Sequence, residues 1–350
     1  MGRALTERPL AAAVAGALTI AFSSILVELA SVAPATAAIF RCAYALPVLG
    51  WLAWREDRRL GPRSPRERRL AVPAGLFFAT DLILWHHAIE DVGAGLSTVL
   101  GNLQVIVVPF AAWAALGERV ERRLLASLPV VCAGIVLISG AFESGAYGAH
   151  PLRGAVFGIG TGVAYSGFML VLRQGSSDLR RPAGPLFDTT AVATLAALLA
   201  GLAIGEADLV PSWPSHAWLV LLALTSQVLG WMLIAVSLPR LPAAITSITL
   251  SIQPIGSVIL GVVLLGEHPT ALQLAGGACI LAALVWVGLG RPRHRRGRDG
   301  EGGPGGGGVS QGRVVATARA WGLRPRDRRC ATAAARGGVM RRSAAAPVRA

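Results

Sequence analysis

The sequence contains no lysine and little charge of any kind, because only 15% of its 350 residues are charged. Soluble domains usually carry charge on about a quarter of their residues, so this scarcity disfavours a soluble enzyme. Hydrophobic residues make up 53% of the chain, and its mean hydropathy is positive. This composition is typical of a membrane protein.

Cysteine is also scarce. Cys42, Cys132 and Cys279 lie singly in apolar stretches and Cys330 lies near the carboxyl end. No pair has the spacing of a zinc site or a disulfide framework, so we expect four free thiols. No Gly-rich loop ends in Lys-Ser or Lys-Thr, which excludes ATP-driven transport within this chain. We expect neither a metal nor a cofactor.

The formal net charge of +14 is unevenly distributed. Residues 1–290 carry 18 Arg against 16 acidic residues, whereas residues 291–350 carry 15 Arg against three. The last segment mixes Arg, Gly and Ala without periodicity, so we expect a disordered cytoplasmic tail that binds no nucleic acid. A compact nucleic-acid-binding domain is disfavoured by the same distribution.

Apolar runs long enough to cross a bilayer recur along the rest of the chain. About 20 residues of helix span the hydrocarbon core, and the alternation of a barrel strand is absent, which predicts helices. The first run follows Arg3 and Arg8, but its length indicates a retained helix and not a signal peptide. Ten spans are predicted: Leu10–Ala30, Ala35–Trp54, Leu70–Ile89, Val92–Leu116, Leu124–Ala141, Leu152–Leu172, Leu186–Ile204, Ala217–Leu238, Leu241–Leu265 and Ala271–Leu289.

The connections between these runs differ strongly in Arg content. With residues 1–9 in the cytoplasm, the inside segments hold 16 Arg and the outside connections hold only Arg153. This asymmetry follows the positive-inside rule and supports an even number of spans. We therefore expect a multi-pass inner (plasma) membrane protein with both termini in the cytoplasm.

The two halves of the chain repeat one pattern. An offset of 149 residues aligns four identical positions in the fourth and ninth runs: Ala94 with Ala243, Gln104 with Gln253, Gly117 with Gly266, and Glu118 with Glu267. Because each half has five helices, the second copy starts on the opposite side of the membrane, as in many secondary transporters. The predicted repeats are residues 10–141 and 152–290.

Several motifs accompany this repeat. They are Pro34 with the Phe40-Arg41 pair, the stretches Leu84–Glu118 and Leu224–Glu267 that each end in Gly-Glu, and the Gln253-Pro254 pair. Over roughly residues 10–290 the sequence resembles the drug/metabolite transporter superfamily, in its ten-helix branch built from two EamA domains. One departure is that the proline of the fourth run comes late, at Pro109. The resemblance implies a carrier of small metabolites or drugs, often outward.

Placing a charged side chain inside the membrane costs several kcal/mol, so each one in a predicted span requires a structural or functional explanation. Arg41 is either an anchor for a substrate carboxylate or phosphate, or a permanent ion-pair partner of Glu28 or Asp81. In apolar surroundings Asp81 favours its neutral form and could carry a coupling proton; the alternatives are an ion pair with Arg41 or a packing role. Glu28 is a weaker candidate near the outer end of its helix. Asp188 is expected to cap the start of the seventh helix.

Histidine and neutral polar residues supply further candidates. His86 and His87 point in different directions on a helix, so a metal site with Asp81 is disfavoured, and we expect an interfacial position or one His in the cavity. The other candidates for substrate contact or helix packing are Asn102, Gln104, Gln227 and Gln253, with aromatic walls from Trp85, Tyr165 and Trp231. Glu118 and Glu267 are expected to have structural roles where their helices end.

The sequence therefore predicts a secondary-active exporter of small metabolites or drugs that works by alternating access, coupled to protons or to exchange. Its expected partners are a small-molecule substrate and the lipid bilayer, with a homodimer as the assembly to consider. Two alternatives stay open: an intramembrane enzyme that uses Asp81, His86 and His87, and a passive channel or membrane scaffold. The inverted repeat favours the carrier over both.

Overall fold

The computed structural model describes residues 8–289 except 117–119, 177, 179, 238–240 and 242. The predictions made for Glu118, for Cys330 and for the tail 291–350 lie outside these residues. Within the described ranges the chain is helical and has no strand. The elements are α2 (Pro9–Ala30), α3 (Pro34–Leu60), α4 (Pro65–Val92), α5 (Ala94–Gly101), α6 (Gln104–Leu116), α7 (Arg122–Ile138), α8 (Pro151–Gly175), α9 (Ala183–Ile204), α10 (Ser215–Leu222), η1 (Ala223–Gly230), α11 (Trp231–Ser237), α12 (Ala243–Leu260), η3 (Gly261–Leu265) and α13 (Ala271–Gly288).

These elements form ten helical segments, one for each predicted run. In the part of the chain that is described, eight segments of at least 18 residues are apolar enough to cross a membrane, and Thr249–Leu265 is a shorter apolar helix. The predicted all-α membrane architecture is confirmed, and the segments agree with the ten predicted spans. Several helices extend beyond the predicted runs, as α3 does by six residues past Trp54.

Local sequence signals set where the helices begin. Proline is the first residue of four helices, where its missing N–H needs no partner, at Pro9, Pro34, Pro65 and Pro151. A capping box also starts α4, in which Ser64 accepts from the Glu67 backbone N–H and the Glu67 carboxylate accepts from that of Ser64. These signals lie outside the apolar runs, which is why hydropathy alone placed several helix starts too late.

The fourth predicted span, Val92–Leu116, consists of two helices, α5 and α6, with a break between them. The chain makes a tight turn at Asn102 and Leu103, where i→i+3 bonds replace the helical pattern, as from Val105 N–H to Asn102 C=O at 3.1 Å. The Asn102 side chain donates to the carbonyl oxygen of Thr98 at 2.8 Å and stabilises the turn. Broken helices of this kind often form the binding sites of secondary transporters.

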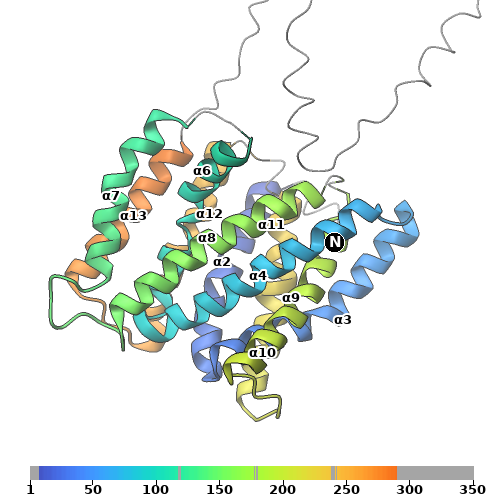
Figure 1. Cartoon of the computed structure of the whole chain (residues 1–350), viewed down its shortest axis with the longest axis horizontal. Helices are drawn as coiled ribbons and strands as arrows, with labels where there is room; N and C mark the ends of the chain where they lie inside the picture. The colour runs from blue at the N-terminus through green and yellow to red at the C-terminus, as the bar shows by residue number, and fades with distance from the viewer. Residues whose placement is uncertain are drawn as a thin grey trace, which may run out of the picture. The chain divides into compact units, whose positions relative to one another are not determined.

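The packing of the helices repeats between the two halves (Figure 1). Helix α4 packs along α8, and its counterpart, the segment α10–η1–α11, packs along α2. Helices α3 and α9 pack against each other, as do α7 and α13, which lie side by side at one edge of the helices in Figure 1. All of these contacts join the two halves, and the α4–α8 contact has its equivalent in the contact of α10–η1–α11 with α2, as expected for two related repeats.

Helices α3 and α9 are joined at both ends by carboxylates. At one end, Glu56 accepts from the backbone N–H groups of Ala183 and Gly184, at 3.0 and 2.8 Å. At the other end, Glu206 accepts from the N–H of Ala35 at 3.3 Å. Each carboxylate lies near the end of one helix and satisfies the start of the other, where unpaired N–H groups and the helix dipole favour a negative charge. The α3–α9 contact is therefore fixed across the two repeats.

A third carboxylate joins the repeats at the start of α5. Glu267, only 3% exposed, accepts from the N–H of Ala94 at 2.5 Å and from that of Gly95 at 3.3 Å. Gly93, at φ +90°, and Gly261 leave the space for this carboxylate, which a Cβ atom at Gly261 would overlap. The structural role predicted for Glu267 is a helix cap contributed by the other repeat.

Candidate functional site

A cavity of about 80 Å³ lies among helices of both repeats. Helices α2, α3, α4 and α5 supply one part of its wall, and α8, α11 and α12 supply the rest. Seven of the eleven candidate residues line it: Arg41, Asp81, Trp85, Asn102, Tyr165, Trp231 and Gln253. The structure thus brings most of the predicted site together at the contact between the repeats.

Three side chains contact the guanidinium of Arg41. Its Nε donates to the Gln227 side-chain oxygen at 3.2 Å, its Nη2 lies 3.5 Å from Ser226 Oγ, and its guanidinium lies 5.6 Å from the centre of the Trp85 ring. Its Nη1 is buried and has no hydrogen-bond partner among the described residues. The alternative of a permanent ion pair is not observed, since no described carboxylate lies within ion-pair distance and Glu28 is exposed.

Asp81 faces the same cavity from α4. It is 7% exposed and Arg41 is 4% exposed, yet no ion pair or hydrogen bond joins the two in the described part of the chain. Buried charges without a partner are costly and mark functional sites more often than structural ones. The cavity therefore offers a guanidinium and a carboxyl group to a ligand.

Aromatic side chains form one wall of the cavity. Tyr165 and Trp231 meet edge to face with their ring centroids 6.2 Å apart, and Phe78, which also lines the cavity, stacks on Phe168 at 4.5 Å. Gln104, which does not line the cavity, hydrogen-bonds the Tyr165 side chain. The aromatic wall suits a flat or apolar group on a ligand.

Four of the predicted residues lie elsewhere: Glu28, His86, Gln104 and Gln227. His86 is 1% exposed and its Nδ1 lies 2.9 Å from the carbonyl oxygen of Pro34, so it is enclosed by protein and does not line the cavity. His87 stacks on Phe157 and lies 3.4 Å from a carboxylate oxygen of Glu206. The two histidines do not converge with Asp81, which removes the geometric basis of the intramembrane-enzyme alternative.

Small hydroxyl residues in the cavity wall were missed by sequence reasoning. They are Ser23 on α2, Thr98 on α5 and Thr161 on α8. Serine and threonine in apolar helices usually bond the preceding turn, so their presence alone does not identify a site. Thr98 does so, to Ala94 C=O at 2.8 Å, whereas Thr161 Oγ1 is buried with no partner among the described residues.

Three of the four cysteines lie in the described part of the chain. Cys42, Cys132 and Cys279 are free thiols there. No cluster of three or more His, Cys, Asp or Glu residues in those ranges is arranged to hold a metal ion.

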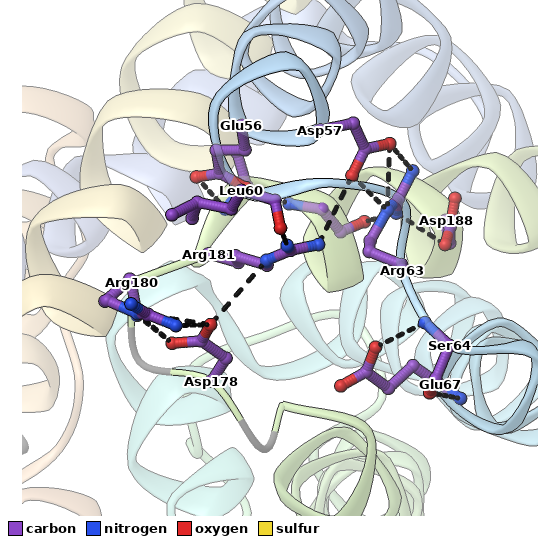
Figure 2. Close-up of polar contacts among 12 residues, drawn as sticks. Glu56, Asp57, Leu60, Arg63, Ser64, Glu67, Asp178, Arg180, Arg181 and Asp188 are labelled. Carbon is purple, nitrogen blue, oxygen red and sulfur yellow. Dashed lines mark hydrogen bonds and ion pairs between the residues drawn. The ribbon is translucent and has the colours of Figure 1, made fainter.

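A polar network lies at the Arg-rich end of α3 and α9 (Figure 2). Arg63 donates to the Gly184 carbonyl at 2.5 Å and to Asp188 at 2.6 Å, and pairs with Asp57 at 3.3 Å. Arg181 extends the network to Asp57 at 3.7 Å and to the Leu60 carbonyl. The prediction that Asp188 caps its helix is wrong, because the helix starts at Ala183 and Asp188 pairs with Arg63 instead.

The outer part of this network is a pair between Asp178 and Arg180 (Figure 2). Arg180 donates to the Asp178 carboxylate at 2.8 and 2.9 Å. These hydrogen bonds lower the pKa of Asp178 from 3.8 to about 2. This pair lies in the connection between α8 and α9, outside both helices.

The family model of EamA-like transporters matches residues 9–140 and 152–289, so two copies cover most of the chain. The chain belongs to the EamA-like transporter family. Together with its apolar helices, this makes it a multi-pass membrane transporter.

Two curated relatives show the breadth of this similarity. The pseudopaline exporter CntI of Pseudomonas aeruginosa is 26% identical over 215 residues, covering 60% of this chain and 72% of the relative. An uncharacterized transporter of Archaeoglobus fulgidus is 27% identical over 181 residues, covering 52% of this chain and 62% of the relative. A protein of known crystal structure matches 81% of this chain and 96% of its own, with a TM-score of 0.51 and 17% identity, which shows a shared fold alone.

Proposed function

We propose that this protein is a secondary-active exporter of small organic metabolites or drugs, in which the central cavity is exposed to the two sides of the membrane in turn. The observation that carries the proposal is that two buried ionisable groups, Arg41 and Asp81, form no ion pair with each other in a cavity lined by both repeats. The outward direction is supported by the name of the relative CntI, an exporter of pseudopaline.

Arg41 is proposed to bind a carboxylate or phosphate of the substrate. Its guanidinium offers a planar set of donors, of which Nη1 is still free in the described structure. Trp85, Tyr165 and Trp231 would contact the less polar part of the same molecule. The present cavity of about 80 Å³ has room for a few waters, whereas drug-sized ligands occupy sites of roughly 300 Å³ or more. Substrate binding therefore requires the helices around the cavity to separate.

Asp81 is proposed to carry the coupling proton. A carboxyl without an ionic partner in an apolar wall can exist in both protonation states as the cavity faces one side and then the other. The excess of Arg in one set of connections supports a cytoplasmic location for both termini. We take residues 10–141 and 152–290 as the two repeats that together enclose the cavity.

The test is flux into proteoliposomes that contain the full chain, with amino acids, sugars, nucleotides, polyamines and cationic drugs as labelled compounds. The proposal expects saturable uptake of at least one compound, driven by a pH gradient. Asp81→Asn should abolish gradient-driven uptake and leave substrate exchange intact, with Asp91→Asn as the control, since Asp91 is paired with Arg153 at 2.6 Å.

Two outcomes would contradict this proposal in different ways. Equal loss of both activities in Asp81→Asn would indicate a structural role for Asp81 and not a proton-carrying one. Flux without saturation, or none for any compound, would favour the passive channel or the membrane scaffold.

A further inference from the structure

Behind Arg41, away from the cavity, lies a chain of buried polar side chains from three helices. Arg41 on α3 bonds Gln227 in η1, and the Gln227 side-chain N–H₂ donates to Thr190 Oγ1 on α9 at 3.3 Å. Gln227 and Thr190 have no exposed surface, and neither lines the cavity. The chain of contacts runs from the cavity wall to a helix that has no part in it.

The order of these contacts fixes which end of the Gln227 amide faces the guanidinium. A glutamine side chain has a donor end and an acceptor end, and Arg41 can only donate. With the N–H₂ group bonded to Thr190, the oxygen points at Arg41 Nε; the reverse orientation would place two donors face to face. The guanidinium therefore sets the orientation of the amide, and the Thr190 hydroxyl, which can accept as well as donate, holds the other end of it by accepting from the N–H₂ group.

The local backbone assists this arrangement. Residues Ala223–Gly230 form a π-helical stretch, an arrangement that is rare and frequently found at functional sites. Within it the consecutive residues Ser226 and Gln227 are both fully buried, and both approach Arg41. Their contacts occupy Nε and Nη2, so Nη1 is the guanidinium nitrogen left for a ligand.

We infer that Thr190 and Gln227 are positioning residues that orient Arg41 for binding an anionic group, although neither contacts the ligand. The inference rests on the proposed role of Arg41 as the anion anchor. It assigns Gln227, until now a candidate for direct substrate contact, to a role that it exerts through Arg41. It also gives Thr190 a function that its position in an apolar helix does not suggest.

The neighbouring residue supplies a matched control. Thr189 is also buried on α9, at 1% exposure, but its hydroxyl has no hydrogen-bond partner among the described residues. Thr189→Val and Thr190→Val make the same change one residue apart. Only the second removes the partner of Gln227.

The experiment is equilibrium dialysis of radiolabelled benzoate and inorganic phosphate against the full chain in detergent. Arg41→Gln should abolish binding of the anion that the wild type retains. Thr190→Val should raise its Kd about tenfold, as expected from the loss of one hydrogen bond, while Thr189→Val changes it less than about twofold. Thr190→Ser, which keeps the hydroxyl, should restore binding. Because Kd does not depend on the amount of folded protein, a loss of stability alone would not produce this pattern.

A double-mutant cycle separates an indirect from a direct role. Gln227→Leu alone should weaken anion binding. Added to Arg41→Lys, which already lacks the Nε contact, it should not weaken anion binding any further. Equal effects of the two threonine variants, or additive effects of Gln227→Leu and Arg41→Lys, would overturn the positioning role alone. No saturable anion binding, or binding that survives Arg41→Gln, would overturn the anion anchor, and the positioning role with it.

Discussion

The carboxylates at the helix ends and the charges in the cavity have opposite surroundings. Glu56 and Glu267 each accept two backbone N–H groups, and Asp57 and Asp188 are bound by Arg63. In the cavity, by contrast, Asp81 has no ionic partner among the described residues and Arg41 keeps one nitrogen free. Carboxyl and guanidinium groups therefore have hydrogen-bond or ionic partners at the helix ends, whereas in the cavity between the repeats the same kinds of group lack some of theirs.

This difference separates two roles. Contacts at the ends supply partners to N–H groups that a helix start cannot pair within itself, so their value is in stability. Unpaired charges in the cavity cost stability, and such costs persist where function requires them. Substitutions at the ends should therefore change stability and spare transport, and substitutions in the cavity should do the reverse.

The largest effect is expected for Arg41→Gln. Loss of charge-assisted hydrogen bonds to a substrate anion should lower the transport efficiency, kcat/KM, about 100-fold, measured as initial flux in proteoliposomes. The free energy of unfolding should change by less than about 1 kcal/mol, because a buried charge without an ionic partner adds little stability. Arg41→Lys keeps the charge without the planar donor set and should be intermediate. An Arg41→Gln variant as active as the wild type would contradict the assignment of Arg41 to transport.

Glu267→Ala should be the most damaging change at a helix end. It leaves the buried N–H groups of Ala94 and Gly95 without their acceptor, which should lower the free energy of unfolding by about 2–3 kcal/mol. Flux per folded molecule should stay within twofold of the wild type, with the folded amount measured by gel filtration. Glu267→Gln retains one acceptor oxygen and should cost less. If Glu267→Ala lost flux while its free energy of unfolding stayed at the wild-type value, Glu267 would have a direct part in transport.

Arg63→Gln should have a smaller effect of the same kind. Arg63 contacts Asp57, Asp188 and the Gly184 carbonyl, and its side chain is only 7% exposed. Removal of a half-buried network of this type should cost about 1–2 kcal/mol, measured as a lower thermal midpoint, with flux per folded molecule unchanged. An effect of Arg63→Gln on the KM of transport would contradict the assignment of this network to stability.

The smallest effect is expected for Arg180→Gln, at the exposed outer pair. Its interaction with Asp178 lowers the pKa of that carboxyl to about 2, so the pair contributes above pH 3.8 and loses its contribution as the pH falls towards 2. Exposed pairs add little, so the thermal midpoint at pH 7 should not change measurably. Chemical denaturation at several pH values checks this, and a clear loss of stability at pH 7 would contradict it.

Much of the fold could be predicted from the sequence, because hydropathy and the Arg distribution report directly on which segments cross a membrane. The helix starts were less accurate, since they depend on Pro65, Ser64 and the carboxylates of other helices. The break at Asn102 escaped detection because Asn102 lies within an otherwise continuous apolar run, and the turn depends on its bond to the backbone of Thr98.

The candidate site was predictable for residues that are costly in a membrane, such as Arg41 and Asp81. The roles of their neighbours were not, because they depend on contacts between distant parts of the chain. Gln227 lies behind Arg41 and not in the cavity, and His86 is bonded to the Pro34 carbonyl. Glu56 and Glu206 lie 150 residues apart, close to the repeat offset, and that spacing was the available signal for their equivalent roles.

The most direct test of this account is a thermal-shift screen of the full chain in detergent against the compounds named above. A ligand at about 100 times its Kd should stabilise the folded protein by about 2.7 kcal/mol, which is readily measured. The shift should be lost in Arg41→Gln and retained in Arg63→Gln, whose own midpoint is lower. A ligand whose shift survives Arg41→Gln and Asp81→Asn would contradict the claim that the unpaired charges of the cavity form the substrate site.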